Sequence, residues 1–318
     1  MGHSMTTTEA PTADLPPLRR LLALGLLAAL IVVAILALWP PQLERRTVVA
    51  SLADGAALMA ELGYTQARWR DELDRVPRLY LTDIGENWRE SWAQDLPLDQ
   101  KKDVFFRLLL PLVLRANELV AADRARLAAL RAAGPDRWST GDRAWLKALA
   151  DLYRLDGTAD PSKTLDRLRA RVDVVPPSLA LAQAAEETGW GTSRFAAAGN
   201  ALFGQWTYDP EGMLPQDQRG ELGDYRVAAF ETPLASVQAY VHNLNTNPVF
   251  GEFRALRAAE HAAGRVPQGL VLAGTLALYS ERGADYVTSI QQIIRVNELA
   301  PVDTARLAAG PALYLSPG

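Results

Sequence analysis

Residues 184–195 read Ala184-Ala185-Glu186-Glu187-Thr188-Gly189-Trp190-Gly191-Thr192-Ser193-Arg194-Phe195. The stretch begins with helix-forming residues, and the glycine at position 189 is typical of a helix that ends there. Upstream, the segment 174–178 contains two consecutive prolines and reads as an extended lead-in, with Ser178 as a candidate helix cap. The pattern therefore predicts a helix over 179–188, followed at once by a turn of glycine and tryptophan.

Glu187 falls in the last turn of this predicted helix, with Gln183 one turn before it on the same face. The negative end of the helix dipole disfavours an ionised carboxyl group there, and apolar neighbours would add a desolvation cost. Both effects raise the pKa, which suits a general acid that works near neutral pH. The segment predicts an acidic group beside an aromatic wall, of the kind that protonates a leaving glycosidic oxygen.

Three further motifs lie downstream at separate places. They are Gly199-Asn200-Ala201-Leu202-Phe203-Gly204-Gln205-Trp206-Thr207, Asn243-Leu244-Asn245-Thr246-Asn247-Pro248 and Tyr279-Ser280-Glu281-Arg282-Gly283-Ala284-Asp285-Tyr286. Together with residues 184–195, they resemble the bacterial glucosaminidase family that cleaves peptidoglycan, and most closely its Bax-type branch. The resemblance covers roughly residues 97–302, and Asn247 stands where the branch has a histidine.

The resemblance implies a mainly α fold, a lysozyme-like α+β architecture with a small β-hairpin lobe. It places the family's acid on Glu187 and a second catalytic role on Tyr286. The substrate-binding residues that it implies are Asn200, Phe203, Trp206, Asn245 and Tyr279. Flat rings can stack on the apolar faces of sugars, although a core position suits Phe203 equally well.

A two-carboxylate mechanism needs a second acid roughly 5 to 10 Å from the first. Glu221 has the nearest spacing to the second acid of some glucosaminidases, and its glycine-flanked setting reads as a mobile loop. Two alternatives remain open. The sugar's own acetamide group can assist the reaction, or a water held by Tyr286 can attack.

Other kinds of site receive little support from the composition. The chain has no cysteine, and its three histidines show no metal-ligand spacing. It has no glycine-rich phosphate loop, and its net charge of −4 with interleaved acids and bases argues against nucleic-acid binding. We therefore expect neither a metal nor a cofactor.

Residues 21–39 form an uninterrupted run without charged side chains, which as a helix would span about 28 Å. Arg19 and Arg20 precede the run, and Trp39-Pro40-Pro41 closes it. The run predicts a single transmembrane helix that is not cleaved. We expect a short cytoplasmic tail over 1–20 and a catalytic domain on the periplasmic or cell-wall side of the bacterial inner membrane.

The remaining chain divides into a membrane-proximal segment, 40–96, and a glucosaminidase-like domain, 97–318, with its catalytic core at about 165–302. Apolar periodicity predicts helices over 98–133, 138–155, 162–172, 232–244, 251–264 and 285–299. Glycine, proline and aromatic residues over 203–230 predict a hairpin-bearing flap.

These observations predict a membrane-anchored peptidoglycan hydrolase, an endo-β-N-acetylglucosaminidase that acts on the glycan strands. One alternative is lytic transglycosylase-type cleavage of the same polymer, which leaves an anhydro end on muramic acid. Another is a weakly catalytic scaffold that binds the cell wall. The membrane anchor also fits unnamed protein partners in cell-wall remodelling.

Overall fold

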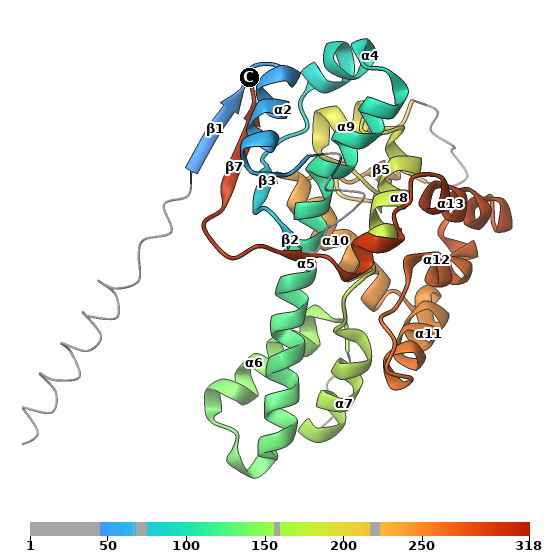
Figure 1. Ribbon diagram of the computed structural model, residues 1–318. Coiled ribbons are helices and arrows are strands. Elements are labelled where there is room, and N and C mark those ends of the chain that lie inside the picture. Colours follow the sequence, from blue (N-terminus) through green and yellow to red (C-terminus); the bar gives the residue numbers. More distant parts are fainter. Residues whose placement is uncertain (1–44, 66, 68–74, 156–159, 217–222) are drawn as a thin grey trace, which may run out of the picture. The chain divides into compact units, whose positions relative to one another are not determined.

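The computed structural model describes residues 45–65, 67, 75–155, 160–216 and 223–318, which fold mainly as helices with a few small sheets (Figure 1). The helices are α2 (Leu52–Glu61), η1 (Trp88–Trp92), α4 (Ala93–Asp95), α5 (Leu98–Ala133), η2 (Pro135–Arg137), α6 (Thr140–Leu152), α7 (Pro161–Arg171), α8 (Pro177–Thr188), α9 (Arg194–Gly199), α10 (Pro233–Thr246), η4 (Pro248–Phe250), α11 (Gly251–Ala262), α12 (Gly269–Leu272), η5 (Ala273–Thr275), η6 (Ala277–Tyr279), α13 (Ala284–Val296) and η7 (Ala300–Thr304). The strands are β1 (Arg45–Val49), β2 (Arg75–Val76), β3 (Leu79–Leu81), β4 (Trp206–Thr207), β5 (Arg226–Val227), β6 (Arg306–Leu307) and β7 (Leu313–Pro317).

The long helix α5 joins two hydrophobic cores (Figure 1). Its first half buries Phe105 and Leu110 in the main core, together with α8, α10 and α13. Its second half buries Leu127 and Leu130 against α6 and α7 in a smaller core. Since each buried leucine contributes roughly 1.5–3 kcal/mol, both ends of α5 are fixed by packing.

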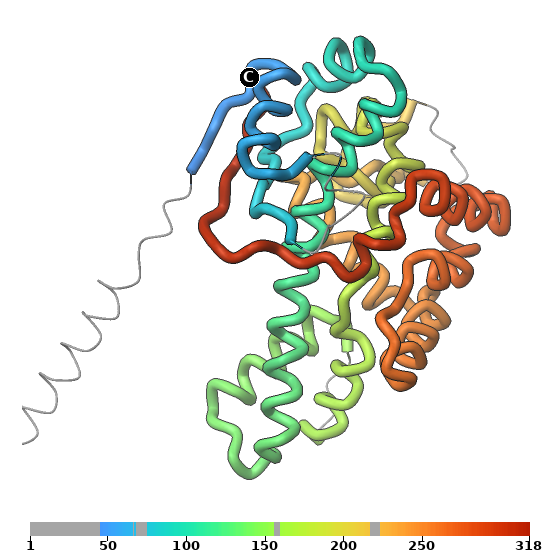
Figure 2. The backbone as a smooth tube through the Cα atoms, in the orientation of Figure 1, coloured from blue at the N-terminus to red at the C-terminus, as the bar shows by residue number. Residues whose placement is uncertain are grey.

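The main core is bordered by a three-stranded sheet in the order β1-β7-β3, in which both pairings are parallel. Figure 2 shows the first and last strands of the described chain running side by side. In β7, Leu313 and Leu315 are buried while the residues between and after them are half-buried, as expected for side chains that alternate across a sheet. The described elements β1, α2, β3 and η1, together with the C-terminal strand β7, thus pack on the same core as α5.

The observed helices agree with those that the periodicity predicts. The helix that carries Glu187 runs from Pro177 to Thr188 and ends at Gly189, which adopts the left-handed conformation with φ 56°. The prediction that Ser178 caps this helix is wrong. Pro176 occupies the cap position, and the Asp303 carboxylate accepts hydrogen bonds from the Ser178 amide and hydroxyl, both at 2.8 Å. A carboxylate from a distant part of the chain therefore accepts the hydrogen bond that a local cap residue would accept at the start of α8.

A small β element does form within residues 203–230. Strands β4 and β5 pair antiparallel, with Trp206 opposite Val227 and Thr207 opposite Arg226. The pairing places Trp206 on a short ribbon at the end of the segment that passes Glu187.

The predicted tail 1–20, the predicted transmembrane run 21–39 and Glu221 all lie outside the described residues. Within the part that is described, no helix is both long and apolar enough to cross a membrane.

Candidate active site

Helix α8 brings Glu187 from the centre of the main core to its edge. Its residues from Pro177 to Ala185 are all buried, whereas Glu187 in the last turn is half-buried. The turn that follows is held tightly, because the Trp88 indole donates to the carbonyl of Trp190 at 3.0 Å. At Gly191, with φ 80°, an added Cβ would lie 2.9 Å from that indole nitrogen. The turn therefore requires a glycine there.

Three buried side chains connect to Glu187 through a chain of hydrogen bonds, which we call the Glu187 network. The Tyr240 hydroxyl donates to Gln183 Oε1 at 2.7 Å. Gln183 Nε2 donates to the Tyr286 hydroxyl oxygen at 2.8 Å. The Tyr286 hydroxyl in turn lies 2.9 Å from Glu187 Oε1 and donates to it. The chain joins α10, α8 and α13 at one point.

The direction of these bonds determines which carboxyl oxygen of Glu187 can carry a proton. Because Tyr240 donates to the amide oxygen of Gln183, the amide nitrogen must face Tyr286 and donate to it. The Tyr286 proton is then directed to Glu187 Oε1, which acts as an acceptor. A neutral Glu187 therefore carries its own proton on Oε2.

Glu187 Oε2 faces the backbone of Gly204. A Cβ at that position would lie 3.0 Å from Oε2, and the backbone has φ 58°, a conformation that favours glycine. The absence of a side chain at Gly204 leaves room at the oxygen that carries the proton.

Burial raises the pKa of Glu187 to about 6. The hydrogen bond from Tyr286 lowers this pKa, the negative charge of Glu186 raises it, and Arg282 lowers it slightly. Glu186 forms an ion pair with Arg282, so its charge is partly compensated. The predicted rise of the Glu187 pKa is therefore present, with desolvation as its main cause.

Two of the predicted substrate-binding residues are not fully buried: Tyr279 contacts the Glu187 network, and Trp206 lies on the surface. Tyr279 stacks on Tyr286 with ring centroids 5.5 Å apart, and its hydroxyl donates to the Phe203 carbonyl at 3.1 Å. Trp206 is 51% exposed and rests against Tyr225 at 4.6 Å. Trp206 thus presents an open aromatic surface two residues after Gly204.

The other predicted substrate-binding residues are buried. Phe203 is 2% exposed, and its ring stacks on that of Tyr240 with centroids 3.9 Å apart. It therefore packs against a member of the Glu187 network. The Asn200 amide accepts from the Ile84 backbone at 3.0 Å and donates to a backbone carbonyl of the loop before α10. Asn245 is fully buried in α10. Substrate contact by these three residues stays a prediction that their placement does not support.

Asn245 belongs instead to a second buried polar cluster, which we call the Asp173 network. The Asp173 carboxylate lies 3.2 Å from Arg124, 3.5 Å from Arg257 and 3.2 Å from His261. Asn245 donates to the Asp173 carbonyl at 2.8 Å and accepts from Arg257 at 2.7 Å. These bonds hold the segment that leads into α8.

The surface beside Trp206 is hollowed into a cavity of about 460 Å³, which we call the polar pocket. Its polar and aromatic lining residues are Arg154, Gln205, Trp206, His242, Asn243, Thr246 and Asn247. Three of them belong to the motif over 243–248. The motif therefore has a buried side at Asn245 and an open side on the pocket.

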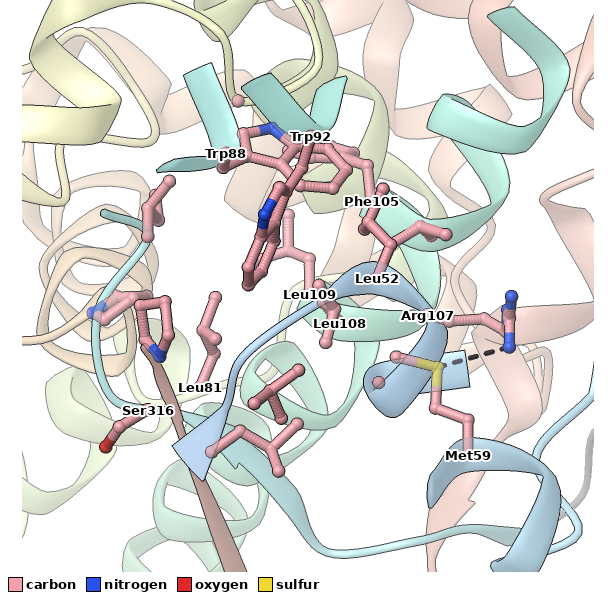
Figure 3. A pocket seen from close by; sticks show the side chains of 18 of the residues that line it. Leu52, Met59, Leu81, Trp88, Trp92, Phe105, Arg107, Leu108, Leu109 and Ser316 are labelled. Atoms are coloured by element: carbon pink, nitrogen blue, oxygen red, sulfur yellow. Dashed lines mark hydrogen bonds between the residues drawn. The ribbon is translucent and has the colours of Figure 1, made fainter. Parts of the chain in front are cut away.

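A separate cavity of about 80 Å³ lies between α2, η1, the first half of α5 and the sheet, and Figure 3 shows that apolar side chains line it. Arg107 is its charged lining residue, and that guanidinium is paired with Asp103. The lining therefore offers no acid or base at the wall of this apolar cavity.

The described residues contain no group of three or more acidic or histidine side chains placed to hold a metal ion. Glu221, the candidate second acid, cannot be placed. Gln183 and Tyr240 are members of the site that sequence reasoning missed as functional residues. Gln183 could have been found, since it lies four residues before Glu187 on the same helix face, but Tyr240 comes from α10 without a local signal.

Comparison with known proteins identifies a domain that contains the Glu187 network. Residues 162–299 match the family model Glucosaminidase, described as mannosyl-glycoprotein endo-beta-N-acetylglucosaminidase. Residues 162–299 thus form a domain of the glucosaminidase family. The glucosaminidase domain includes α8, α10 and α13, which together supply the whole Glu187 network.

The chain is also 33% identical over 187 residues to Protein bax of Escherichia coli, strain K12, which supports the Bax-type branch. The match covers 58% of this chain and 66% of that relative, just under two thirds of its length. No solved structure matches the chain significantly. The family assignment supports an enzyme of the glycosidase type.

Proposed function

We propose that this protein is a peptidoglycan hydrolase that cleaves the glycan strand at N-acetylglucosamine, with Glu187 as the general acid. The observation that carries the proposal is a half-buried carboxyl group with a pKa of about 6, held by Tyr286 at 2.9 Å. A general acid is most effective when its pKa lies near the working pH. The finer fold assignment that we propose is the lysozyme-like α+β architecture.

In the proposed reaction, Glu187 Oε2 donates its proton to the glycosidic oxygen as the bond to the anomeric carbon breaks. The bond electrons remain on the departing oxygen, and positive charge develops at the anomeric carbon. Water, or first the sugar's own acetamide oxygen, then attacks that carbon. The Glu187 carboxylate accepts the proton that the attacking water releases, which restores the acid.

Tyr286 acts in this proposal as a positioning residue. Its ring is buried, with 1% exposure, and its hydroxyl fixes Glu187 Oε1 while Oε2 is left for the substrate. A donor at Oε1 also stabilises the carboxylate that forms when the proton leaves.

We further propose that residues 21–39 anchor the chain in the inner membrane, with the glucosaminidase domain on the periplasmic or cell-wall side. The length and apolar character of that run support the anchor. The location of peptidoglycan outside the membrane supports the orientation.

The decisive experiment compares two neighbouring substitutions in the full chain, purified in detergent. Glu187→Gln keeps the size of the side chain and removes the acid, so release of soluble fragments from peptidoglycan should fall about 100- to 10,000-fold. Glu186→Gln is the matched control, because its carboxylate is paired with Arg282. The control should keep most of the activity, because loss of the Glu186 charge lowers the Glu187 pKa but leaves the acid in place.

Mass spectrometry of the released ends identifies the bond. Reducing N-acetylglucosamine ends support the proposal, and anhydro-muramic ends would show lytic transglycosylase-type cleavage instead. Binding to peptidoglycan without turnover would identify a scaffold. Fragment release by Glu187→Gln at the wild-type rate would remove Glu187 from the reaction.

A further inference from the structure

The polar pocket is formed by three parts of the chain that are distant in sequence. Gln205 and Trp206 line one wall, and Arg154, just after α6, lines another. The third wall is one face of α10, on which Ala239, His242, Asn243 and Thr246 recur at spacings of three and four residues. The motif that contains Asn243 thus presents a continuous polar face to the pocket.

One polar atom of a pocket-lining residue has no hydrogen-bond partner in the described part of the protein. Gln205 Oε1 is buried and has no hydrogen-bond partner among the described residues. A buried acceptor without a donor costs about 1–3 kcal/mol in other proteins, so its presence calls for a ligand that can donate to it. The N–H of an amide group is a donor of the required kind.

The charge in the pocket is positive. Arg154 lines it, is exposed, and forms no ion pair within the described part of the chain. None of the described lining residues is acidic. A free guanidinium beside neutral amides is suited to a carboxylate, which it can bind through two parallel hydrogen bonds.

The remaining groups favour a ligand that has both amides and an acid. The His242 Nε2–H donates to the Leu152 carbonyl at 2.7 Å, which fixes the orientation of the ring in the pocket wall. The Asn243 Oδ1 atom accepts from Asn247 at 3.3 Å, which leaves its amide nitrogen as a donor. The exposed Trp206 ring adds an apolar surface to these donors and acceptors.

The pocket begins next to the proposed reaction centre. Gly204 lies beside Glu187 Oε2, and Gln205 and Trp206 follow it directly. Since consecutive Cα atoms are about 3.8 Å apart, the pocket wall starts within about 4–8 Å of chain after Gly204. A substituent on a glycan that is bound at Glu187 can reach this distance.

We propose that the polar pocket binds the acidic peptide branch of the glycan substrate, with Arg154 on a peptide carboxylate and Gln205 Oε1 on a peptide N–H. The inference rests on the proposed function, because it assigns a specificity site to the same substrate. It makes the enzyme selective for glycan strands that still carry their peptides. A pocket for a sugar acetamide group alone would use Gln205 and Trp206 but would have no need of Arg154.

The first test compares intact peptidoglycan fragments with the same glycan after an amidase has removed its peptides. For the full-length wild-type protein, we expect kcat/KM to be at least tenfold higher on the intact fragments. Arg154→Gln should lower the ratio of the two kcat/KM values about tenfold, mainly through KM, and Arg154→Lys should restore part of it. Arg137→Gln is the matched control, since Arg137 is an exposed arginine near the smaller core that does not line the pocket.

A second test measures binding without catalysis. The probe is the acidic tetrapeptide released from peptidoglycan, titrated by calorimetry into Glu187→Gln and into Glu187→Gln combined with Gln205→Leu. We expect saturable binding that weakens about tenfold when Gln205 is replaced. The same replacement should leave the melting temperature unchanged or raise it, because it removes a buried acceptor that has no partner.

The outcomes separate this inference from the proposed function. Equal cleavage of both substrates, or an Arg154→Gln loss that is the same on both, would overturn the peptide site and leave the hydrolase intact. If the wild-type protein cleaves neither substrate, the proposed function fails, and the peptide titration still decides the binding site. Absence of saturable peptide binding in that titration would overturn the inference by itself.

Discussion

The two buried polar networks differ in where they end. In the Glu187 network, neutral tyrosine and glutamine side chains donate in sequence. The chain of bonds ends at the half-buried Glu187 carboxyl group, which lies beside Gly204. The Asp173 network surrounds its carboxylate with two arginines, a histidine and a backbone amide, and its side chain is 6% exposed. The first network leaves one oxygen available for chemistry, whereas the second uses its oxygens internally.

This difference explains why similar motifs have different roles. Asn245 lies in a family-like motif, yet both ends of its amide are bonded within the Asp173 network. Glu187 has one oxygen that accepts from Tyr286 and one that forms no hydrogen bond with the described residues. Both Asn245 and Glu187 lie in motifs that resemble the family. They differ in how many of their polar atoms already have a hydrogen-bond partner in the folded protein.

The largest expected effect on stability concerns the Asp173 network. Arg257→Met should lower the free energy of unfolding by about 3–5 kcal/mol, because it leaves the Asp173 carboxylate and nearby carbonyls without their buried partner. Urea denaturation measures the change. Arg265→Met is the control, since Arg265 is in an exposed pair with Glu260 that is worth about 0–1 kcal/mol. A loss below 1 kcal/mol for Arg257→Met would show that the network does not hold the fold.

The Glu187 network should make the free energy of unfolding depend on pH. The Glu187 pKa is raised from 4.5 to about 6, so the folded state binds more protons than the unfolded state between these values. The free energy of unfolding should therefore fall by about 1–2 kcal/mol as pH rises from 4.5 to 7. Asp303, whose pKa is also raised to about 6 by burial, adds a change of the same sign.

Urea denaturation across this pH range tests the linkage. Glu187→Gln has no titrating group at this position. In this variant the free energy of unfolding should therefore change less with pH, and the change that remains should come from Asp303. An identical slope in the variant and the wild type would show that Glu187 titrates alike in both states.

A smaller change tests the hydrogen bond that orients Glu187. Tyr286→Phe removes a bond that lowers the Glu187 pKa, so the alkaline limb of the pH–activity profile should move to higher pH. The cost in stability should be about 1 kcal/mol. Tyr279→Phe is the control, because its hydroxyl bonds to a backbone carbonyl, and it should leave the limb in place. The same shift in both variants would contradict the assignment.

The smallest effect lies away from both networks. Gly55 is inside α2 at the wall of the apolar cavity, where an added Cβ would meet Val49 at 3.4 Å, an ordinary contact. Gly55→Ala should raise the free energy of unfolding by about 0.5–1 kcal/mol, measured as a higher melting temperature. Gly204→Ala should do the reverse, because its backbone has φ 58° and Glu187 is close. A lower melting temperature for Gly55→Ala would mean that α2 is not a regular helix there.

Much of the local structure could be predicted from the residues themselves. The helix that ends at Gly189, the position of Glu187 in its last turn, and the long helix over 98–133 follow from periodicity and helix-stop signals. Strand β7 could not be predicted in the same way. Its partners lie more than 230 residues earlier, and parallel pairing leaves no local turn signal.

The sequence by itself determined the helix that ends at Gly189 and the place of Glu187 in its last turn, and it predicted that this carboxyl group is the acid, because helix position, neighbouring motifs and residue type are all local properties. Only the tertiary structure decided that Tyr240 and Tyr286 orient it, that Asp303 replaces Ser178 as the cap of α8, and that Asn245 supports the fold. Hydrogen-bond partners depend on the packing of distant helices. The number of bonds that a polar atom still lacks is therefore a property of the folded chain.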